Sequence, residues 1–479
     1  MHETFIAGAV EPAVLDPGEE PLLLVADQWD VSEWNGRVVL QAWDRQRNLV
    51  RKIVGLKEQR RDRLCLVIER FPKAQAELQV ADLAAPRGRE LGRTTSRRAF
   101  GERFHLMLSR EFPDWRVEEV SSEPNLEQSL SPSYTRAFLR QGTTGIAVMA
   151  AAPGAAAAGV VTFGLIWLDY LRRREKAVSP WRLLLFVPLG SEREVVFRAA
   201  CISPEAVACQ VFGFDEKDRA GVIDFADAGN VESTLPPCRR APSPNVENQA
   251  LPDHPDVDRV ESPDGSVSLQ IRGLEFARVA GGKLTCGISK QRRAGIETVA
   301  AMAGEIARVR NPDAEDRQHP LYSLNPERWL ESQVRTHPAA IDASLLFSPI
   351  YGQVPVFSGI SRDVIDLLGI DHKGRLAVIE LKATADLQLS FQALDYWLRV
   401  RKHLVAGDFE RLGYFEEYVI SRESPRILLV APALEFHSTT ETVLSVLSPE
   451  IEVTRIGLAG DWRSGLRVMF RLQGGEKPG

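Results

Sequence analysis

Short apolar runs alternate with charged and turn residues between positions 37 and 83 of the chain. Runs of this kind, bounded by polar residues, are typical of strands. They lie at 38–40, 53–54, 64–68 and 78–80. We therefore predict a small antiparallel β unit in this part of the chain. Residues 100–112 then show the spacing of an amphipathic helix, which Pro113 ends.

The next segment alternates strand-like and helix-like patterns, which predicts an α/β unit. The pattern indicates strands at 115–120, 134–139, 145–152 and 183–187, and a helix at 160–174. Within this segment, residues 144–168 carry no charge and are long enough to span a bilayer. Because Pro153 and Gly154 interrupt the stretch, we interpret it as a strand, a loop and a buried helix. A membrane span is the alternative interpretation.

Residues 233–265 divide the chain almost in half and show no hydrophobic period. They contain seven prolines and, from residue 245 on, six acidic residues against one arginine. This composition predicts a linker or a long surface loop. Beyond it, alternation over 267–271, followed by Gly281 and Gly282, predicts a hairpin that ends near residue 288. A helix is predicted at 294–309. The expected division is a β-rich domain at 1–95, an α/β domain at 96–232, the linker, and a domain at 266–479.

The pattern from 325 to 432 holds the candidate chemistry. Asn325 and Pro326 predict a helix start, and this helix carries Trp329, Leu330 and Val334 inward with Glu331 beside them. An extended run follows at 350–356. The next predicted elements are a strand at 362–368 that contains Asp366, a turn at 371–374, and a strand at 376–382. Side chains alternate along a strand, so Val378, Glu380 and Lys382 share one face of the last strand.

A carboxylate and an amine on an otherwise buried strand are unfavourable unless each has a partner. A divalent cation held between Asp366 and Glu380 would partner both acids. The helix that follows has one apolar face and one polar stripe, which could line a phosphodiester groove beside Glu380 and Lys382. The stripe consists of Gln388, Gln392, Tyr396, Arg399 and His403.

Composition and charge narrow the class of protein. The chain has 479 residues, 44% of them hydrophobic and 26% charged, with a net charge of −6, which excludes a disordered or fibrous protein. Residues 37–110 contain 18 Lys and Arg against 8 Asp and Glu, a net of +10, so the remainder carries −16. Such asymmetry suggests a nucleic-acid or membrane contact on the basic part. Arginine suits phosphate because its planar fork can donate two parallel hydrogen bonds. The candidate DNA-binding residues in this part are Arg93, Arg97 and Arg98.

Other features bear on compartment and ligands. The five cysteines form no CxxC pair, which argues against a disulfide framework or a zinc site and favours a reducing compartment. The start of the chain lacks the basic residues and apolar core of a signal peptide, so a cytoplasmic protein is expected. Gly281-Gly282-Lys283 lacks P-loop spacing, so no nucleotide is expected as a ligand.

The motif Asp366, Glu380-Leu381-Lys382 and Gln392-Ala393-Leu394-Asp395-Tyr396 resembles the PD-(D/E)XK nuclease superfamily. More narrowly, it looks like the RecB-like branch, which adds a QxxxY signature, and within it the NucS-type DNA endonucleases. The resemblance covers roughly a quarter of the chain. It departs from the family pattern in one place, since Ile365 stands where the PD signature has proline.

The resemblance implies a restriction-endonuclease-like αβββαβ core, a metal-dependent endonuclease of DNA repair or defence, and roles for individual residues. Asp366, Glu380 and the Leu381 carbonyl would ligate Mg²⁺ or Mn²⁺, which prefer oxygen ligands. Lys382 would orient the attacking water, and Glu331 would contact a water on the metal. Gln392 and Tyr396 would position the DNA backbone. Gln388, Arg399 and His403 would contact DNA, and a homodimer is possible.

Simpler interpretations remain open. Glu380 and Lys382 could form an edge-strand ion pair, and Asp366 could cap a turn. The polar stripe could be a solvated face, with Arg399 and His403 part of a cation cluster at a helix end. Glu327, one turn before Glu331, could take its role. The chain could also be a non-catalytic DNA-binding or assembly protein that reuses a nuclease fold.

The first half of the chain repeats the predicted element order of the 325–432 region. Residues 165–175, LIWLDYLRRRE, compare with residues 393–403, ALDYWLRVRKH. The middle unit is therefore interpreted as a degenerate copy of the nuclease fold, with convergent α/β order as the alternative. It lacks the chemistry, because Met149-Ala150-Ala151-Ala152 stands where the acid and lysine would be.

Overall fold

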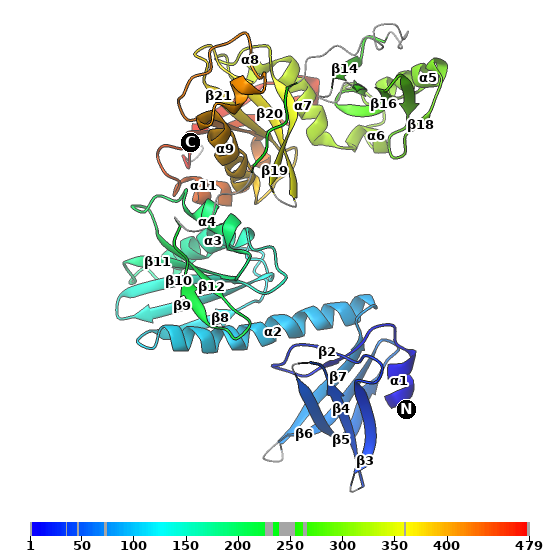
Figure 1. The fold of residues 1–479 in the computed structure, drawn as a ribbon, viewed down its shortest axis with the longest axis vertical. Coiled ribbons are helices and arrows are strands. Elements are labelled where there is room, and N and C mark those ends of the chain that lie inside the picture. Colours follow the sequence, from blue (N-terminus) through cyan, green and yellow to red (C-terminus); the bar gives the residue numbers. More distant parts are fainter. Residues whose placement is uncertain are drawn as a thin grey trace. The chain divides into compact units, whose positions relative to one another are not determined.

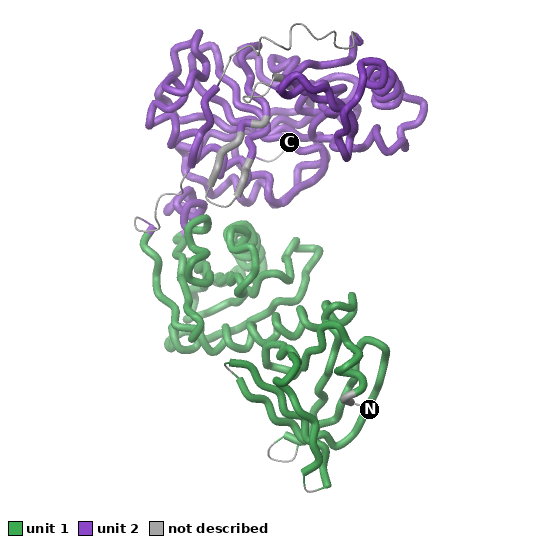
Figure 2. The backbone as a smooth tube through the Cα atoms, turned by 45° about the vertical axis from the view of Figure 1, so that its right-hand side comes forward, with its two compact units in different colours: residues 1–195, 208–224 green, residues 196–207, 225–479 purple. Residues whose placement is uncertain are grey.

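The structure is a computed structural model that describes residues 2–34, 36–45, 47–70, 74–225, 233–238, 254–261, 266–358 and 361–476. Backbone contacts divide the chain into two compact units (Figure 2). Unit 1 contains residues 1–195 and 208–224, and unit 2 contains residues 196–207 and 225–479. The described strands form four β-sheets, each accompanied by helices (Figure 1). This multi-domain α/β architecture confirms the predicted fold class.

The first sheet of unit 1 has seven antiparallel strands in the order β2-β1-β7-β6-β5-β4-β3. The elements are α1 His2–Gly8, β1 Pro12–Leu15, β2 Leu22–Leu23, β3 Trp29–Trp34, β4 Arg37–Trp43, β5 Asn48–Gln59, β6 Arg63–Arg70 and β7 Ala74–Asp82. Alternate residues of these strands face a core that includes Leu40, Leu66, Ile68 and Leu78. The antiparallel unit predicted at 37–83 is confirmed, and three further strands precede it.

The arginine-rich residues before position 100 lie on a helix, α2 (Pro86–Glu111), which starts well before the predicted helix at 100–112. Two glycines let α2 approach the end of β7. A Cβ atom at Gly88 would lie 1.9 Å from the Asp82 carbonyl oxygen, and one at Gly92 would lie 2.8 Å from a methyl carbon of Leu83. Because small residues make this contact, the first turns of α2 carry no apolar period that the sequence could reveal.

The second sheet of unit 1 lies between α2 and α3. Its order is β13-β12-β11-β10-β9-β8, with β10, β11 and β12 parallel to one another and the other pairs antiparallel. The elements are β8 Arg116–Ser121, β9 Tyr134–Gln141, β10 Thr144–Ala151, α3 Gly159–Arg174, β11 Trp181–Pro188, α4 Glu192–Ala199, β12 Ala208–Phe214 and β13 Ala220–Val222. Phe104 of α2 packs on Val148 and Phe186. On the opposite face, Gly164 of α3 lies against Leu185.

The charge-free stretch at 144–168 forms β10, a loop and most of α3, as the Pro153-Gly154 break predicts. Within the described ranges, no helix is both long enough and apolar enough to cross a membrane.

A small sheet opens unit 2, in the antiparallel order β14-β15-β16-β17-β18. The elements are β14 Val257–Glu261, β15 Val267–Ile271, β16 Leu274–Ala280, β17 Lys283–Cys286, β18 Arg292–Arg293, α5 Ile296–Val309 and α6 Pro320–Ser323. β14 lies inside the segment predicted as a linker, of which residues 239–253 and 262–265 lie outside the described residues. The hairpin predicted over 267–288 contains an additional strand, β16, because the chain already turns at Arg272 and Gly273.

Arg310 and Gly273 join the small sheet to the helix that follows, α7 (Pro326–Thr336). The Arg310 side chain is fully buried and stacks 4.9 Å from the Trp329 ring centre. It donates hydrogen bonds to the carbonyl oxygens of Arg272, Leu321, Leu324 and Asn325 at 2.6–3.3 Å. Gly273 has a φ of 75°, and a Cβ atom there would lie 1.9 Å from the Arg328 carbonyl oxygen. A side chain at position 273 is therefore excluded by both backbone conformation and space.

The last sheet is built around the predicted chemistry. Its order is β19-β20-β21-β22-β23-β24, with β21, β22 and β23 parallel and the other pairs antiparallel. The remaining elements are α8 Pro338–Ile341, β19 Tyr351–Ser358, β20 Ser361–Ile370, β21 Leu376–Leu381, α9 Leu389–Val405, α10 Asp408–Arg411, β22 Arg426–Pro432, η1 Ala433–Glu435, α11 Thr439–Leu444, β23 Val453–Leu458, η2 Trp462–Ser464 and β24 Val468–Gln473. Helix α7 covers one face, where Trp329 and Leu330 pack on Ile379. Helix α9 covers the other, where Val400 and Leu404 pack on Val378.

The second sheet of unit 1 and the last sheet of unit 2 have the same topology. In each, a helix precedes three antiparallel strands, a second helix leads into a parallel strand, and a short helix leads into a second parallel strand and an antiparallel edge strand. The repeated element order predicted from the sequence is therefore present in the fold. It extends to the direction of every strand pair in the two sheets.

Candidate active site

Strands β20 and β21 place Asp366 and Glu380 at neighbouring positions on the sheet. Leu367 of β20 pairs with Ile379 of β21. Asp366 precedes Leu367 and Glu380 follows Ile379, so in this antiparallel pair the two acids lie side by side. The Leu381 backbone N–H donates a hydrogen bond of 3.0 Å to Asp366 Oδ2, which fixes the Asp366 carboxylate against β21. Asp366 is half-buried, whereas Glu380 is only 3% exposed. The prediction that these acids lie together is consistent with this geometry.

Glu380 is the most strongly perturbed acid of this group. Burial raises the pKa of its carboxyl well above the usual range, the nearby charge of Asp366 raises it further, and Lys382 partly opposes both. Its Oε2 atom is buried, and within the described chain it has no hydrogen-bond partner. A buried carboxylate beside a second carboxylate binds protons tightly unless a cation is present, because two like charges in a poorly solvated place repel.

Lys382 is the first residue beyond β21 and lies between two acids. Its Nζ atom is 3.7 Å from Glu380 Oε1 and 3.6 Å from an Asp386 carboxylate oxygen. Asp386 also accepts a 2.7 Å hydrogen bond from the Gln388 backbone N–H at the start of α9. Asp386 was not predicted as a site residue, because residues 382–386 form no helix or strand whose spacing would place it beside Lys382. The Lys382 ammonium group is therefore held beside Glu380 and Asp386, and the side chain is half-buried.

Glu331 of α7 is buried, and the negative charge of Asp366 acts on its carboxyl group. Burial raises the pKa of Glu331, while the charges of Arg328 and Arg335 oppose the rise. Arg328 is 2.9 Å from Glu331 Oε2. The absence of a side chain at Gly352 leaves room for Glu331, since a Cβ atom there would lie 3.0 Å from Oε1. These contacts favour Glu331 over Glu327 as the helix acid of the site.

Arg328 and Arg335 were not predicted as site residues. Arg328 precedes Glu331 by three positions and Arg335 follows it by four, and helical neighbours at these spacings meet on one face. Both arginines, with Glu331, line a cleft of about 430 Å³ whose other wall is the small sheet, including Gln270, Glu275 and Arg278. We call it the Glu331 cleft. Its charged lining is mixed, with Arg278, Arg328 and Arg335 against Glu275 and Glu331, and the charge of Asp366 acts on Glu331.

The polar stripe predicted on α9 divides into two parts. Gln392 Oε1 is buried and, within the described residues, accepts no hydrogen bond, and the Tyr396 ring packs on the core beside Val378. Gln388 is half-buried at the start of the helix. These three residues lie at the end of α9 that follows Asp386, so their predicted contact with a substrate stays a prediction.

Arg399 and His403, predicted to contact DNA, are instead buried, each only 4% exposed. His403 Nδ1 lies 2.7 Å from Asp408 Oδ2, and its Nε2 lies 2.8 Å from the Ser233 hydroxyl. Helix α10 and residues 233–238 cover this part of α9, so the predicted DNA contact of His403 stays a prediction for a side chain that is buried in this structure. Periodicity within one helix cannot reveal a cover supplied by distant segments.

The side chains at the acid pair fit a divalent cation, although they do not form a complete shell by themselves. Within the described part of the chain, no group of three or more His, Cys, Asp or Glu side chains could hold a metal ion. The expected donors include only two side chains, the carboxylates of Asp366 and Glu380, with the backbone carbonyl of Leu381 as a third oxygen. The vacant acceptor position of Glu380 Oε2 and the hardness of carboxylate oxygens suit Mg²⁺ or Mn²⁺.

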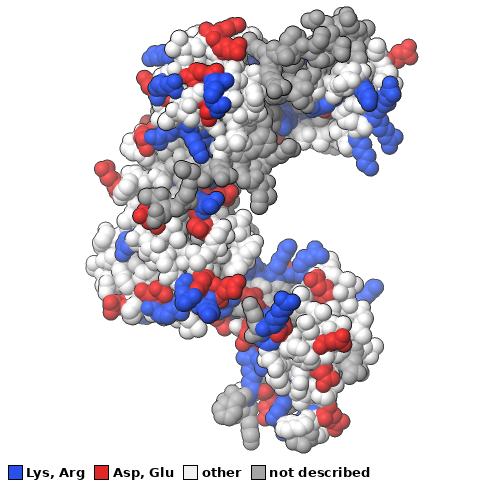
Figure 3. All heavy atoms as spheres, viewed as in Figure 1, with Lys and Arg blue, Asp and Glu red and all other residues white. Residues whose placement is uncertain are grey.

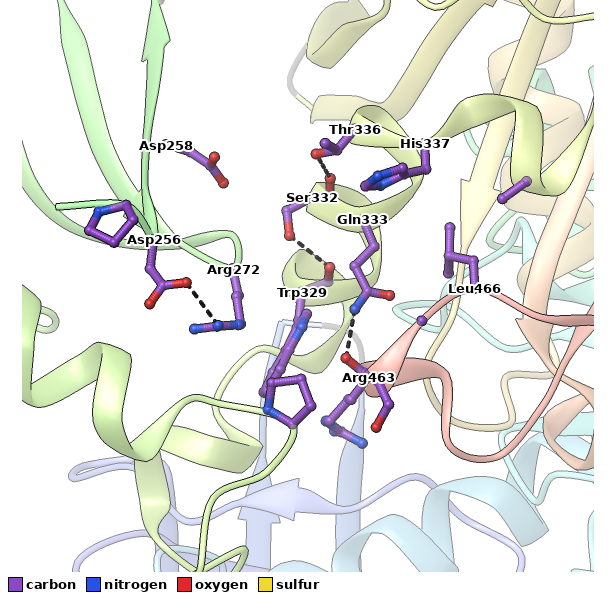
Figure 4. Close-up of a pocket in the computed structure, with 15 residues that line it drawn as sticks. Asp256, Asp258, Arg272, Trp329, Ser332, Gln333, Thr336, His337, Arg463 and Leu466 are labelled. Atoms are coloured by element: carbon purple, nitrogen blue, oxygen red, sulfur yellow. Dashed lines mark hydrogen bonds and ion pairs between the residues drawn. The ribbon is translucent and has the colours of Figure 1, made fainter.

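A second pocket, of about 610 Å³, lies along α7 on a side lined by none of the predicted site residues. Figure 4 shows Asp256 paired with Arg272 on one wall and Gln333 bound to the Arg463 carbonyl on the other, with Trp329 between them. The arginines around Trp329 include Arg272 and Arg463, at 5.9 and 5.4 Å from its ring centre. The faces of the indole are thus engaged by the protein's own cations.

The predicted basic surface of unit 1 lies on α2. Arg93 and Arg98 are exposed and Arg97 is half-buried. Arg97 donates to the Arg93 carbonyl and the Thr94 hydroxyl one turn earlier, and Arg98 is 3.8 Å from Glu102 on the same helix. Figure 3 shows basic side chains over the amino-terminal half of α2, with acidic side chains among them. The contacts of Arg97 and Arg98 stay within the helix and leave its outer surface basic.

The raised pKa of Glu380 predicts a specific pH dependence of stability in metal-free protein. Between the ordinary glutamate pKa of about 4.3 and the raised value, the folded state binds more protons than the unfolded state, so stability falls as pH rises. We expect Glu380→Gln to remove this loss and to raise the free energy of unfolding at neutral pH by about 1–3 kcal/mol. Urea unfolding in the presence of a chelator, from pH 4.5 to pH 8, measures it.

Glu275 provides a control of opposite sign. Burial raises its pKa, but hydrogen bonds from Arg278 and Ser268 outweigh burial and leave the pKa below the usual range. Its contribution to stability is present at neutral pH and is lost as pH falls through the lowered pKa. Glu275→Gln should therefore destabilise the protein at neutral pH.

If the free energy of unfolding of Glu380→Gln equals that of wild type at every pH, the expected cost of burying Glu380 is contradicted.

Comparisons with known proteins yield structural likenesses alone. No family model and no curated protein matches the chain. The solved structures that match include the crystal structure of a repair endonuclease from Pyrococcus abyssi, with 18% sequence identity over 40% of this chain and 73% of that chain, and a TM-score of 0.18. A TM-score this low carries no argument, so functional conclusions rest on the residues of the site.

Proposed function

We propose that this protein is a divalent-metal-dependent nuclease that hydrolyses phosphodiester bonds of DNA, as an endonuclease of DNA repair or defence. The observation that carries the proposal is the acid pair of Asp366 and Glu380. Glu380 Oε2 is buried and has no hydrogen-bond partner among the described residues, and Lys382 Nζ lies 3.7 Å from Glu380 Oε1. Burying two acids and a lysine costs stability, and a catalytic site gives a reason to retain all three.

Asp366, Glu380 and the Leu381 carbonyl would hold Mg²⁺ or Mn²⁺. The ion, when bound, supplies activation of water and neutralisation of charge on the phosphate. Lys382 would hold the attacking water by a hydrogen bond and favour its deprotonation through its positive charge. Asp386 positions the Lys382 ammonium group from the side opposite Glu380.

Glu331 and α9 would orient the reactants. Glu331 is buried on α7, the helix that covers the opposite face of the sheet from α9, and would accept a hydrogen bond from a water in the site. Gln392 has an acceptor oxygen with no hydrogen-bond partner among the described residues and, with Tyr396, would contact the DNA backbone next to the scissile phosphate. The basic side chains of the Glu331 cleft would draw phosphate groups toward the acids.

The second candidate is a DNA-binding or assembly protein without catalysis. The second sheet of unit 1 has the same topology as the last sheet and carries the buried cation of Arg136 on β9, so the topology alone does not require catalysis. The last sheet retains Asp366, Glu380 and Lys382 together, which favours catalysis for that sheet.

Incubation of the full chain with linear and circular DNA, each single- and double-stranded, tests the proposal. We expect cleavage with Mn²⁺ or Mg²⁺ and none with a chelator. DNA binding without cleavage under all of these conditions would support the non-catalytic candidate instead.

A further inference from the structure

The two sheets of equal topology can be compared residue by residue through their strand pairing. Val148 pairs with Leu184 on the sheet face covered by α2, and Ile379 pairs with Leu428 on the face covered by α7. Each pair also stands two residues before the last pair of its ladder, which is Ala150 with Phe186 in one sheet and Leu381 with Val430 in the other, so the two pairs are equivalent. The same register makes Met149 the counterpart of Glu380, since each is the next residue along its strand.

The same alignment of the strands identifies the counterparts of the other site residues. Ala151 is the counterpart of Lys382. Because Ala137 pairs with Val148 and Leu367 pairs with Ile379, Arg136 is the counterpart of Asp366. Met149 and Ala151 are buried and apolar. The sheet of unit 1 thus lacks the acid pair, and a guanidinium stands where one acid would be.

Contacts with neighbouring residues hold the Arg136 side chain in place. It is 6% exposed, and it donates hydrogen bonds of 2.7 Å to the Glu123 carbonyl and 3.1 Å to the Ser121 hydroxyl. Its guanidinium also stacks 5.5 Å from the Trp167 ring centre. A fixed positive charge at this place repels a metal cation. Among the described residues, the chain therefore carries one set of candidate catalytic residues, although it carries two copies of the sheet topology.

Equivalent segments of the two copies pair with each other inside unit 2. Ile202 lies three residues beyond the end of α4, and Leu447 lies three residues beyond the end of α11, which is the counterpart of α4. These two residues form an antiparallel bridge. The Ser203 N–H donates to the Val446 carbonyl, and the Ser448 N–H donates to the Cys201 carbonyl, both at 2.8 Å.

Two exchanged hydrogen bonds are the ordinary pattern of an antiparallel bridge, so this pairing makes the segment around Ile202 part of unit 2. The paired residues are buried, at 4% and 9% exposure, so the segment is already covered within one chain. A two-pronged ion pair from Arg198 to Asp395, at 3.0 and 2.6 Å, anchors it to α9.

We propose that one chain, whose described residues hold two copies of the sheet topology and one set of candidate catalytic residues, nicks one strand of duplex DNA per encounter. The proposal rests on the nuclease function proposed above. The two strands of a duplex run in opposite directions, and a symmetric dimer matches this with two sites related by a two-fold axis. A chain with one catalytic set meets only one strand in a given orientation, so the first product is a nick.

A supercoiled plasmid distinguishes the possible outcomes. The full chain is incubated with the plasmid and Mn²⁺, and nicked and linear forms are followed from the earliest time points. We expect nicked circles to accumulate first, with linear DNA appearing only as independent nicks meet. Sedimentation equilibrium without metal should give the mass of one chain, 53.3 kDa, over the concentrations used for cleavage.

Linear product that forms from the outset in parallel with nicked product, or a mass of two chains, overturns this inference and leaves the nuclease proposal standing. Absence of any cleavage with Mn²⁺ or Mg²⁺ overturns the nuclease proposal, and the inference falls with it. Mixing wild type with excess Glu380→Gln tests whether one active chain is sufficient for cleavage. The rate per active chain should stay constant for a one-chain nickase and should fall if two active chains must meet.

Discussion

Glu380→Gln and Asp366→Asn should each reduce DNA cleavage by at least about a thousandfold. Each substitution keeps the shape of the side chain and removes the negative charge that a divalent cation requires. The Leu381 N–H can still meet the oxygen of an asparagine at position 366, so the fold around β21 is preserved. Initial rates on plasmid DNA with Mn²⁺ measure the effect, and circular dichroism checks the fold.

Groups that act as a unit lose activity non-additively. The double variant should therefore be no less active than either single variant. On α7, Glu331→Gln should lower the rate, whereas Glu327→Gln, one turn earlier and not in contact with the acid pair by any described interaction, serves as its matched control. Cleavage at the wild-type rate by either Glu380→Gln or Asp366→Asn would remove the acid pair from the mechanism.

Combined replacement of Arg93, Arg97 and Arg98 by alanine should weaken DNA binding and make it less sensitive to salt. Each phosphate contact that is lost reduces the slope of log affinity against log salt by about 0.9 on duplex DNA, so three contacts reduce it by up to about 2.7. The arginines lie on the outer surface of α2, and the basic part of the chain carries +10. Fluorescence anisotropy between low and moderate salt, with a chelator present, gives the slope.

Arg116, Arg173 and Arg219 offer a triple control of equal charge, since their side chains are 79%, 63% and 71% exposed. Their removal lowers the net charge of unit 1 by the same amount without touching α2. Equal slopes for the α2 variant and wild type, with the fold retained, would show that the α2 arginines serve another purpose, such as pairing with acidic parts of the chain.

The sequence was sufficient where local pattern and burial coincide. β21 has apolar neighbours on both faces, and Ala377, Ile379 and Leu381 alternate with Val378 and Glu380 as strand geometry requires. The same pattern predicted β8 to β11 and α3. The acid pair was predictable because a charged residue within such a strand is conspicuous.

Tertiary contacts decided the elements that the sequence did not reveal. β14 is a strand because it pairs with β15, although its own residues are polar and follow a proline-rich stretch. Burial of His403 depends on Ser233 and Asp408, which lie 170 and 5 residues away along the chain. The cation at Arg136 could not be recognised as the counterpart of Asp366 before strand register was known.

Arg310 determines how the Glu331 cleft can respond to a substrate. Its hydrogen bonds join carbonyl groups from the small sheet, from the segment after α5 and from the start of α7 into one body. The close approach of Gly273 to the Arg328 carbonyl removes the remaining freedom at the same junction. The small sheet and the start of α7, which form the two walls of the cleft, are thus joined through one buried side chain and one close backbone approach. A substitution at Arg310 or Gly273 would therefore change the shape of the Glu331 cleft without altering any residue of the acid pair.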